Sequence, residues 1–130
     1  MIEVDIVTPT RKLVEGAKAN TVKVPTAVGQ IEVLPGHTEL VTLLDTGELM
    51  LVSDGQVRRF AISYGFAEIR KDRVIILAET AEESREIDKQ RAIAAQKRAE
   101  QALGAVLTED HFKKQQLKLQ RAIIRQHVAG

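Results

Sequence analysis

Hydrophobic and polar residues follow one pattern up to about residue 80 and another pattern after it. In the first part, short segments alternate apolar and polar residues or are wholly apolar, with turn-forming residues between them. A period of two indicates half-buried strands, and many short strands indicate an antiparallel sandwich or barrel. We expect Asp54-Gly55 to form a tight hairpin turn and Gly65 to end one strand before the next begins. The predicted strands are residues 2–7, 21–24, 31–34, 40–44, 48–53, 57–64, 66–70 and 74–78.

The second part has the pattern of two helices joined by a short break. Residues 84 to 105 contain no proline and many alanines, which favour helix. Thr80 and Glu83 have the spacing of a capping box for this helix, with Ser84 as an alternative cap. Gly104 and Thr108 bracket the break, and the second helix is predicted to end near residue 128. So short a break predicts an antiparallel hairpin.

These patterns divide the chain into a β-sandwich over residues 1–83 and a helical hairpin over residues 84–130. The first helix presents mainly alanine methyl groups, so it buries little apolar area. We therefore expect the hairpin to be weakly held, and a ligand that binds one arrangement to shift the equilibrium towards it.

Charge changes between the two parts. Residues 1–83 hold 9 Lys/Arg and 13 Asp/Glu, a net charge of −4, whereas residues 84–130 hold 10 Lys/Arg and 5 Asp/Glu, a net charge of +5. This asymmetry predicts that the hairpin meets an anionic partner. The chain of 130 residues has no cysteine, which excludes disulfides and cysteine-ligated zinc. It has no apolar run of roughly 20 residues and no signal-peptide pattern at its start, so we expect a cytosol-facing protein without membrane insertion.

Basic residues of the hairpin have a spacing that suggests a polyphosphate site. Asp88 and Arg91 share a helix face, Arg98 follows seven residues later, and Arg121 and Arg125 form an i,i+4 pair on the second helix. Guanidinium groups bind phosphate oxygens through paired, charge-assisted hydrogen bonds. Scattered charges on a solvated helix face produce the same spacing, so the pattern alone leaves both interpretations open.

The first part carries no constellation typical of an enzyme. His37 is its only histidine, and it has neither a phosphate-binding glycine loop nor a nucleophile elbow. We therefore expect no catalytic residues, no metal site and no turnover by this chain alone.

Several short motifs, in order and at this total length, resemble the epsilon-subunit family of bacterial F-type ATP synthases. The motifs are Val7-Thr8-Pro9, Gly29-Gln30-Ile31-Glu32-Val33-Leu34-Pro35-Gly36-His37, Leu40-Val41, Gly65-Phe66-Ala67-Glu68-Ile69 and Ile87-Asp88-Lys89-Gln90-Arg91-Ala92. The last matches the Ile/Leu-Asp-x-x-Arg-Ala pattern of family members that bind ATP. The resemblance covers nearly the whole chain.

The resemblance implies a rotor subunit at the cytoplasmic face of the bacterial cell membrane, peripheral to it. The sandwich would dock on the gamma subunit and, through the loop residues Glu32, Pro35, Gly36 and His37, on the c-ring. The hairpin would allow catalysis when folded on the sandwich. It would block ATP hydrolysis when extended along gamma to the alpha and beta subunits of the catalytic head.

The family's nucleotide site also carries over by position, with ATP as a regulatory ligand that favours the folded hairpin. The arginines would hold the phosphates, Ile87 and Ala92 would pack on the adenine, and Asp88 would orient an arginine or accept a hydrogen bond from the base or ribose. The implied residues are Glu82, Ile87, Asp88, Arg91, Ala92, Arg98, Arg121 and Arg125.

Three other interpretations compete with a rotor subunit. A nucleic-acid-binding β-barrel with a basic arm would need stacking aromatic residues, and the three Phe and one Tyr form no such platform. A free-standing ATP-sensing regulator would differ by not co-purifying with gamma, and an enzyme would turn over ATP. Within the family, the chloroplast subunit is the alternative to the bacterial one.

Overall fold

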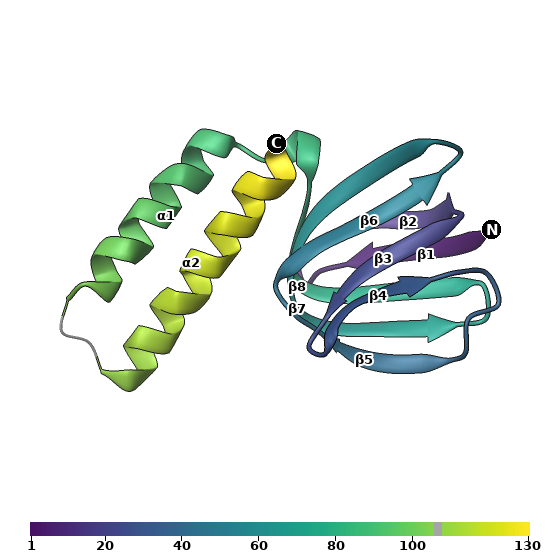
Figure 1. Cartoon of the computed structure of the whole chain (residues 1–130), viewed down its shortest axis with the longest axis horizontal. Coiled ribbons are helices and arrows are strands. Elements are labelled where there is room, and N and C mark those ends of the chain that lie inside the picture. The colour runs from purple at the N-terminus through teal and green to yellow at the C-terminus, as the bar shows by residue number, and fades with distance from the viewer. Residues whose placement is uncertain (106–107) are drawn as a thin grey trace.

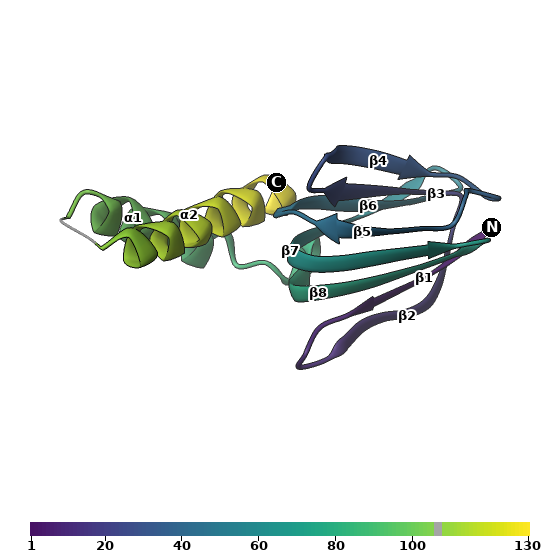
Figure 2. The ribbon, with the colours of Figure 1, turned by 90° about the horizontal axis from the view of Figure 1, so that it is seen from below.

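The computed structural model describes residues 1–105 and 108–130, and it has a two-layered β part with a helical hairpin at one end (Figures 1 and 2). The predicted antiparallel sandwich followed by a two-helix hairpin is confirmed. The described strands are β1 (Ile2–Val7), β2 (Lys12–Ala19), β3 (Thr21–Thr26), β4 (Gly29–Val33), β5 (Leu40–Leu44), β6 (Gly47–Ser53), β7 (Gln56–Arg70) and β8 (Arg73–Glu83). The helices are the 3₁₀ turn η1 (Ser84–Glu86), α1 (Lys89–Leu103) and α2 (Glu109–Ala129).

Strand β7 connects the two layers, and it corrects the prediction that Gly65 ends a strand. Its first half pairs with β6 and its second half with β5, while β8 pairs along both halves. The backbone bends at Tyr64 and Gly65, which have φ values of 46° and 129°. A Cβ atom on Gly65 would lie 1.8 Å from the carbonyl oxygen of Leu77, so only glycine fits this bend. The glycine therefore redirects one continuous strand.

Strand β2 was absent from the predicted strands because its alternation is interrupted. Gly16 has a φ of 67°, and the pairing of β1 with β2 shifts register between Val4 and Ile6. The Gly16 amide donates instead to the Asp5 carboxylate, with a nitrogen–oxygen distance of 2.7 Å. A bulge of this kind removes the period of two by which a strand is recognised. Strand β1 also pairs with β8 in parallel, the exception to the antiparallel arrangement among the described pairings.

The sandwich has a core that is aliphatic except for Phe60, and the hairpin does not share it. Phe60, Leu49, Ile62, Ile69 and Ile76 are essentially unexposed and belong to one cluster formed by strand residues. The buried residues of the hairpin are small and lie outside that cluster: Ala92, Ala99, Ala122 and Val128. Helix α2 lies between α1 and the sandwich (Figure 1).

The start of the hairpin differs from its prediction. Thr80 and Glu83 belong to β8, and α1 begins only at Lys89 with Asp88 as its N-cap. A capping box does form, but between Glu83 and Glu86 at the 3₁₀ turn. Cross-strand pairing with β7 extends β8 to Glu83 and overrides the local capping signal. Thr108 lies just before α2, as predicted, and its side chain caps that helix. The break after Gly104 includes residues 106 and 107, which lie outside the described residues.

Candidate functional site

A cleft of about 450 Å³ runs between α1 and α2. Helix α1 contributes small residues and one cation: Ala95, Arg98, Ala99 and Ala102. Helix α2 contributes mainly long polar residues: Gln115, Lys118, Arg121, Ala122 and Arg125. Alanine side chains are too short to fill the space between two helices, so the alanines of α1 leave the cleft open. The same short side chains make the packing within the hairpin weak.

The cleft is strongly positive. Four of its nine lining residues are Lys or Arg, and none is Asp or Glu. Among these four cations, Arg125 is the one that forms an ion pair within the described part of the chain, and its partner is Glu82 on β8. Nε of Arg125 lies 2.7 Å from Oε1 of Glu82, and Nη2 donates a hydrogen bond to Oε2 at 3.3 Å. The Nε–H of Arg125 does not point at Oε1, so the closer contact is electrostatic. Like charges without counter-ions repel one another, and a bound anion would relieve that repulsion.

Arg121 lies at the boundary between the cleft and the sandwich, as Arg125 does. It lines both the cleft and a small cavity of about 10 Å³ towards the sandwich, where Ile124, Ala61 and Ile62 also lie. Its Nε atom is buried and meets no hydrogen-bond acceptor among residues 1–105 and 108–130. A buried donor without a partner is costly, so this arrangement favours a ligand that supplies an acceptor.

The structure brings together only some of the residues predicted to bind ATP. Arg98, Arg121 and Arg125 line the cleft, and Glu82 joins them through Arg125. Arg91 is exposed and outside the cleft lining.

The residues around the predicted adenine position have other surroundings. Ile87 is half-buried in the linker before α1, and Ala92 has no exposed surface. The Asp88 carboxylate accepts a hydrogen bond of 3.1 Å from the backbone amide of Arg91, so it caps the helix in this arrangement. Their roles towards a nucleotide remain predictions.

Lys118 and Gln115 line the cleft but were not among the predicted residues. The sequence does contain a signal for Lys118, because it precedes Arg121 by three residues and Arg125 by seven. Positions i, i+3 and i+7 lie on one helix face.

The linker to the hairpin is fixed to the sandwich by two paired arginine–carboxylate contacts. Arg11 donates to both oxygens of Glu86 at 2.8 and 3.2 Å, and Arg58 donates to both oxygens of Glu83 at 3.0 Å. Arg58 holds the pKa of the Glu83 carboxyl below its ordinary value, and Arg11 does the same for the pKa of Glu86. The chain is therefore anchored up to Glu86, and α1 begins three residues later.

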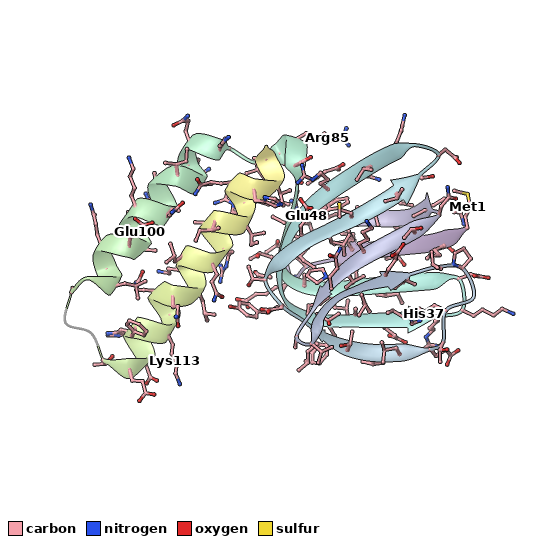
Figure 3. All side chains as sticks on the ribbon, in the orientation of Figure 1. Met1, His37, Glu48, Arg85, Glu100 and Lys113 are labelled. Carbon is pink, nitrogen blue, oxygen red and sulfur yellow. The ribbon has the colours of Figure 1, made fainter. Side chains whose placement is uncertain are left out.

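A second contact between hairpin and sandwich lies at the end of α2. Nε2 of His127 is 3.8 Å from Oε2 of Glu48 on β6, and Arg59 also pairs with that carboxylate. Figure 3 labels Glu48 beside the hairpin. Both this contact and the Arg125–Glu82 pair come from the C-terminal half of α2. A few polar contacts and a small apolar patch thus hold the hairpin in place.

The predicted c-ring loop lies at the other end of the sandwich, where Figure 3 labels His37 away from the hairpin. Glu32 is in β4, and Pro35 and Gly36 are exposed in the turn that follows it. The Gly36 amide donates to Asp72 at 2.9 Å, and the His37 amide donates to the Leu34 carbonyl at 3.1 Å. These bonds fix the turn and leave its outer surface open to a partner.

The described part of the chain contains neither a metal-binding cluster nor a membrane-spanning helix. No group of three or more His, Asp or Glu side chains there is arranged to hold a metal ion. No described helix has the length and apolar character needed to cross a membrane.

Two family models together match the whole chain. Residues 1–84 match the β-sandwich domain of the ATP synthase delta/epsilon chain, and residues 85–130 match its long α-helix domain. The chain belongs to the ATP synthase delta/epsilon chain family. The resemblance found in the sequence is thereby confirmed.

Known members of the delta/epsilon family are similar to this chain over almost its full length. The ATP synthase epsilon chain of Geobacter metallireducens is 42% identical over 130 residues, covering 99% of this chain and 94% of that protein. The ATP synthase epsilon chain of Bacillus velezensis is 42% identical over 129 residues, covering 99% and 97%.

Solved structures share the delta/epsilon fold at low sequence identity. A chain in the OSCP/F1/c-ring part of the Euglena gracilis mitochondrial ATP synthase superposes with a TM-score of 0.85 at 21% identity, covering 99% of this chain and 81% of that one. A chain in the central stalk and c-ring of the Tetrahymena thermophila enzyme superposes with a TM-score of 0.68 at 12% identity, covering 99% and 96%. Both matches include the hairpin as well as the sandwich.

Proposed function

We propose that this chain is a non-catalytic subunit of the central stalk of a bacterial F-type ATP synthase, at the cytoplasmic face of the cell membrane. The full-length similarity to chains named ATP synthase epsilon chain supports this proposal. The fold shared with chains of two stalk and c-ring assemblies agrees with it. In this role the sandwich joins the gamma subunit to the c-ring, and Glu32, Pro35, Gly36 and His37 contact the c-ring.

The hairpin is the regulatory element in this proposal. Packed on the sandwich, it leaves the catalytic head free; extended along gamma to the alpha and beta subunits, it blocks ATP hydrolysis. The supporting observation is that the hairpin has its own small buried residues and contacts the sandwich through one half of α2. An element held by so few contacts can be displaced at a cost of a few kcal/mol.

ATP is the proposed ligand that favours the packed hairpin, and the cation-lined cleft is the observation that carries this part. Its cations come from both helices, so the phosphate-binding surface exists only while α1 and α2 are packed together. A ligand that binds one of two states stabilises that state by mass action. No metal ion is part of the proposal.

The test is reconstitution with a catalytic head and gamma subunit that lack this chain. We expect the full chain to co-purify with gamma and to lower the rate of ATP hydrolysis. Arg125→Ala removes the pair with Glu82, so this variant is expected to bind gamma normally and to inhibit more strongly. Failure to co-purify with gamma would contradict the stalk assignment and support a free-standing regulator.

A further inference from the structure

One arginine of the turn between β1 and β2 ties the linker before α1 to the sandwich. Nη2 of Arg11 donates to the carbonyl of Ala81 on β8 at 3.1 Å and to Oε1 of Glu86 at 3.2 Å. Nη1 of Arg11 donates to Oε2 of Glu86 at 2.8 Å. A guanidinium group with three such bonds has a fixed orientation, because its donors lie in one plane. Arg11 therefore holds the 3₁₀ turn η1 in place beside the last strand.

Hydrogen bonds at η1 complete this fixed segment. The backbone amide of Glu83 donates to Oε1 of Glu86 at 2.9 Å, and the amide of Ile87 donates to the Ser84 carbonyl at 3.3 Å. Figure 3 labels Arg85 on this turn, at the boundary between sandwich and hairpin. The chain is thus held by its neighbours as far as the amide of Ile87.

The backbone hydrogen bonding is interrupted directly after this amide. The Ile87 carbonyl and the Asp88 amide form no hydrogen bond among residues 1–105 and 108–130. The bonds of α1 begin at the Asp88 carbonyl, which accepts from the Ala92 amide at 3.0 Å. Both linker residues have extended backbone, with φ and ψ of −76° and 123° at Ile87 and of −82° and 102° at Asp88. The ψ angle of Ile87 and the φ angle of Asp88 can therefore change without breaking a backbone hydrogen bond.

A bend at any neighbouring place would break existing interactions. Further back in the chain, it would break the contacts of Arg11 or the paired contact between Arg58 and Glu83. Further along the chain, it would break hydrogen bonds of α1 or the N-cap that Asp88 provides. Rotation about the two free torsion angles leaves all of these interactions intact, so it is the least costly way to redirect α1.

We propose that α1 turns at Ile87 and Asp88 when the hairpin leaves the sandwich, and that Arg11 fixes this pivot by holding η1. The inference rests on the proposed displacement of the hairpin and adds to it the pivot and the residue that positions it. With η1 held, the displaced helix can point in few directions, so it loses little conformational entropy when it reaches a partner. Without Arg11, the flexible segment lengthens to residues 84–88 and the displaced helix is less directed.

Amide hydrogen exchange of the full chain without nucleotide locates the pivot. Arg125→Met releases the hairpin by removing the pair with Glu82. We expect the exchange of α2 amides to rise about five- to thirtyfold in this variant, and the exchange of the Glu83 and Ile87 amides to change less than twofold. A comparable rise at Glu83 and Ile87 would place the bend before η1 and overturn the proposal. Unchanged exchange of α2 would overturn it as well, because the hairpin would then not be displaced.

Arg11→Gln tests the role of Arg11 in the same measurement. Lys12→Gln is the matched control, since Lys12 is the adjacent exposed cation and forms no ion pair or hydrogen bond with the linker in the described part of the chain. We expect Arg11→Gln to speed the exchange of the Glu83 and Ile87 amides at least about threefold, and Lys12→Gln to leave both unchanged. Arg11→Lys keeps the charge without the planar fork, so it is expected to resemble Arg11→Gln. Unchanged exchange in Arg11→Gln would overturn this role.

Reconstitution with gamma and the catalytic head separates this inference from the proposed function. Arg11→Gln is expected to bind gamma normally and to inhibit ATP hydrolysis about two- to fivefold less than Lys12→Gln, because a less directed helix reaches the head less often. Equal inhibition by the two variants would overturn the directing role of Arg11. Absence of inhibition by the unmodified chain would contradict the proposed function, whereas the exchange of Glu83 and Ile87 in the isolated chain decides the pivot by itself.

Discussion

Two arginines one turn apart on α2 are expected to affect the stability of the packed hairpin in opposite directions. Arg121 has a buried Nε with no acceptor and no ion pair among the described residues, whereas Arg125 pairs with Glu82 across the boundary between hairpin and sandwich. Methionine has a similar length and helix propensity to arginine, so Arg→Met changes charge and polarity with little effect on the helix itself. The two substitutions thus isolate the electrostatic role of each residue.

The structure sets the size of each effect. Arg121→Met removes an unsatisfied, partly buried donor, which is expected to stabilise the ligand-free hairpin by about 1 kcal/mol. Arg125→Met leaves the Glu82 carboxylate, whose side chain is 31% exposed, without its partner. The expected cost is about 1–2 kcal/mol, at the lower end for a buried charge because water still reaches Glu82.

Amide hydrogen exchange of α2 in the isolated, nucleotide-free chain measures both effects. Protection is expected to rise about fivefold in Arg121→Met and to fall about five- to thirtyfold in Arg125→Met. Both variants are expected to bind ATP more weakly than the unmodified chain. Loss of protection in Arg121→Met, similar to that in Arg125→Met, would refute the idea that the cleft cations lie in an unfavourable arrangement that a ligand relieves.

Three further predictions concern the elements that position the hairpin. Gly65→Ala is expected to destabilise the sandwich by at least about 3 kcal/mol in urea unfolding, because the new Cβ atom would overlap a backbone carbonyl. Gly55 also has a positive φ but has open space around it, so Gly55→Ala is expected to cost only about 1 kcal/mol. Asp88→Ala removes the N-cap of α1 and is expected to lower stability by about 1 kcal/mol, with faster exchange of the first-turn amides. Arg58 lowers the pKa of Glu83 in the folded chain, so this pair stabilises the linker above the ordinary pKa of 4.5 and progressively less as the pH falls below it. Proteolysis of the linker is therefore expected to increase below that pH in the unmodified chain and to vary less with pH in Glu83→Gln. Linker cleavage that does not vary with pH would contradict this prediction.

The division into sandwich and hairpin was predictable because its signals are local and periodic. Alternation in β1 and alanine content in α1 each reflect a single element meeting water on one side. The start of α2 after Thr108 was likewise predictable, since the cap that Thr108 forms involves only the residues of the first turn. Features that depend on a distant strand were missed or misplaced. Strand β2 is stabilised by pairing through a bulge, and β8 continues past Thr80 because β7 lies beside it.

The candidate site was partly predictable for the same reason. The i,i+4 spacing of Arg121 and Arg125 placed both on one face, and they do line the cleft with Arg98. The pair between Glu82 and Arg125 joins residues 43 apart in the sequence, and its geometry depends on where α2 packs. Arg91 and Arg98 both lie in α1, and how far the cleft extends along that helix depends on the packing of α2, which no local signal shows.

Calorimetric titration of ATP into the isolated chain, with one arginine of each helix replaced in turn, tests the central claim most directly. If ATP binds across both helices and holds the hairpin packed, Arg98→Ala and Arg125→Ala each weaken ATP binding at least about tenfold, since each removes charge-assisted hydrogen bonds. Lys97→Ala, next to Arg98 but outside the cleft, is expected to bind as the unmodified chain does. No binding at millimolar ATP, or binding that neither arginine affects, would contradict the claim.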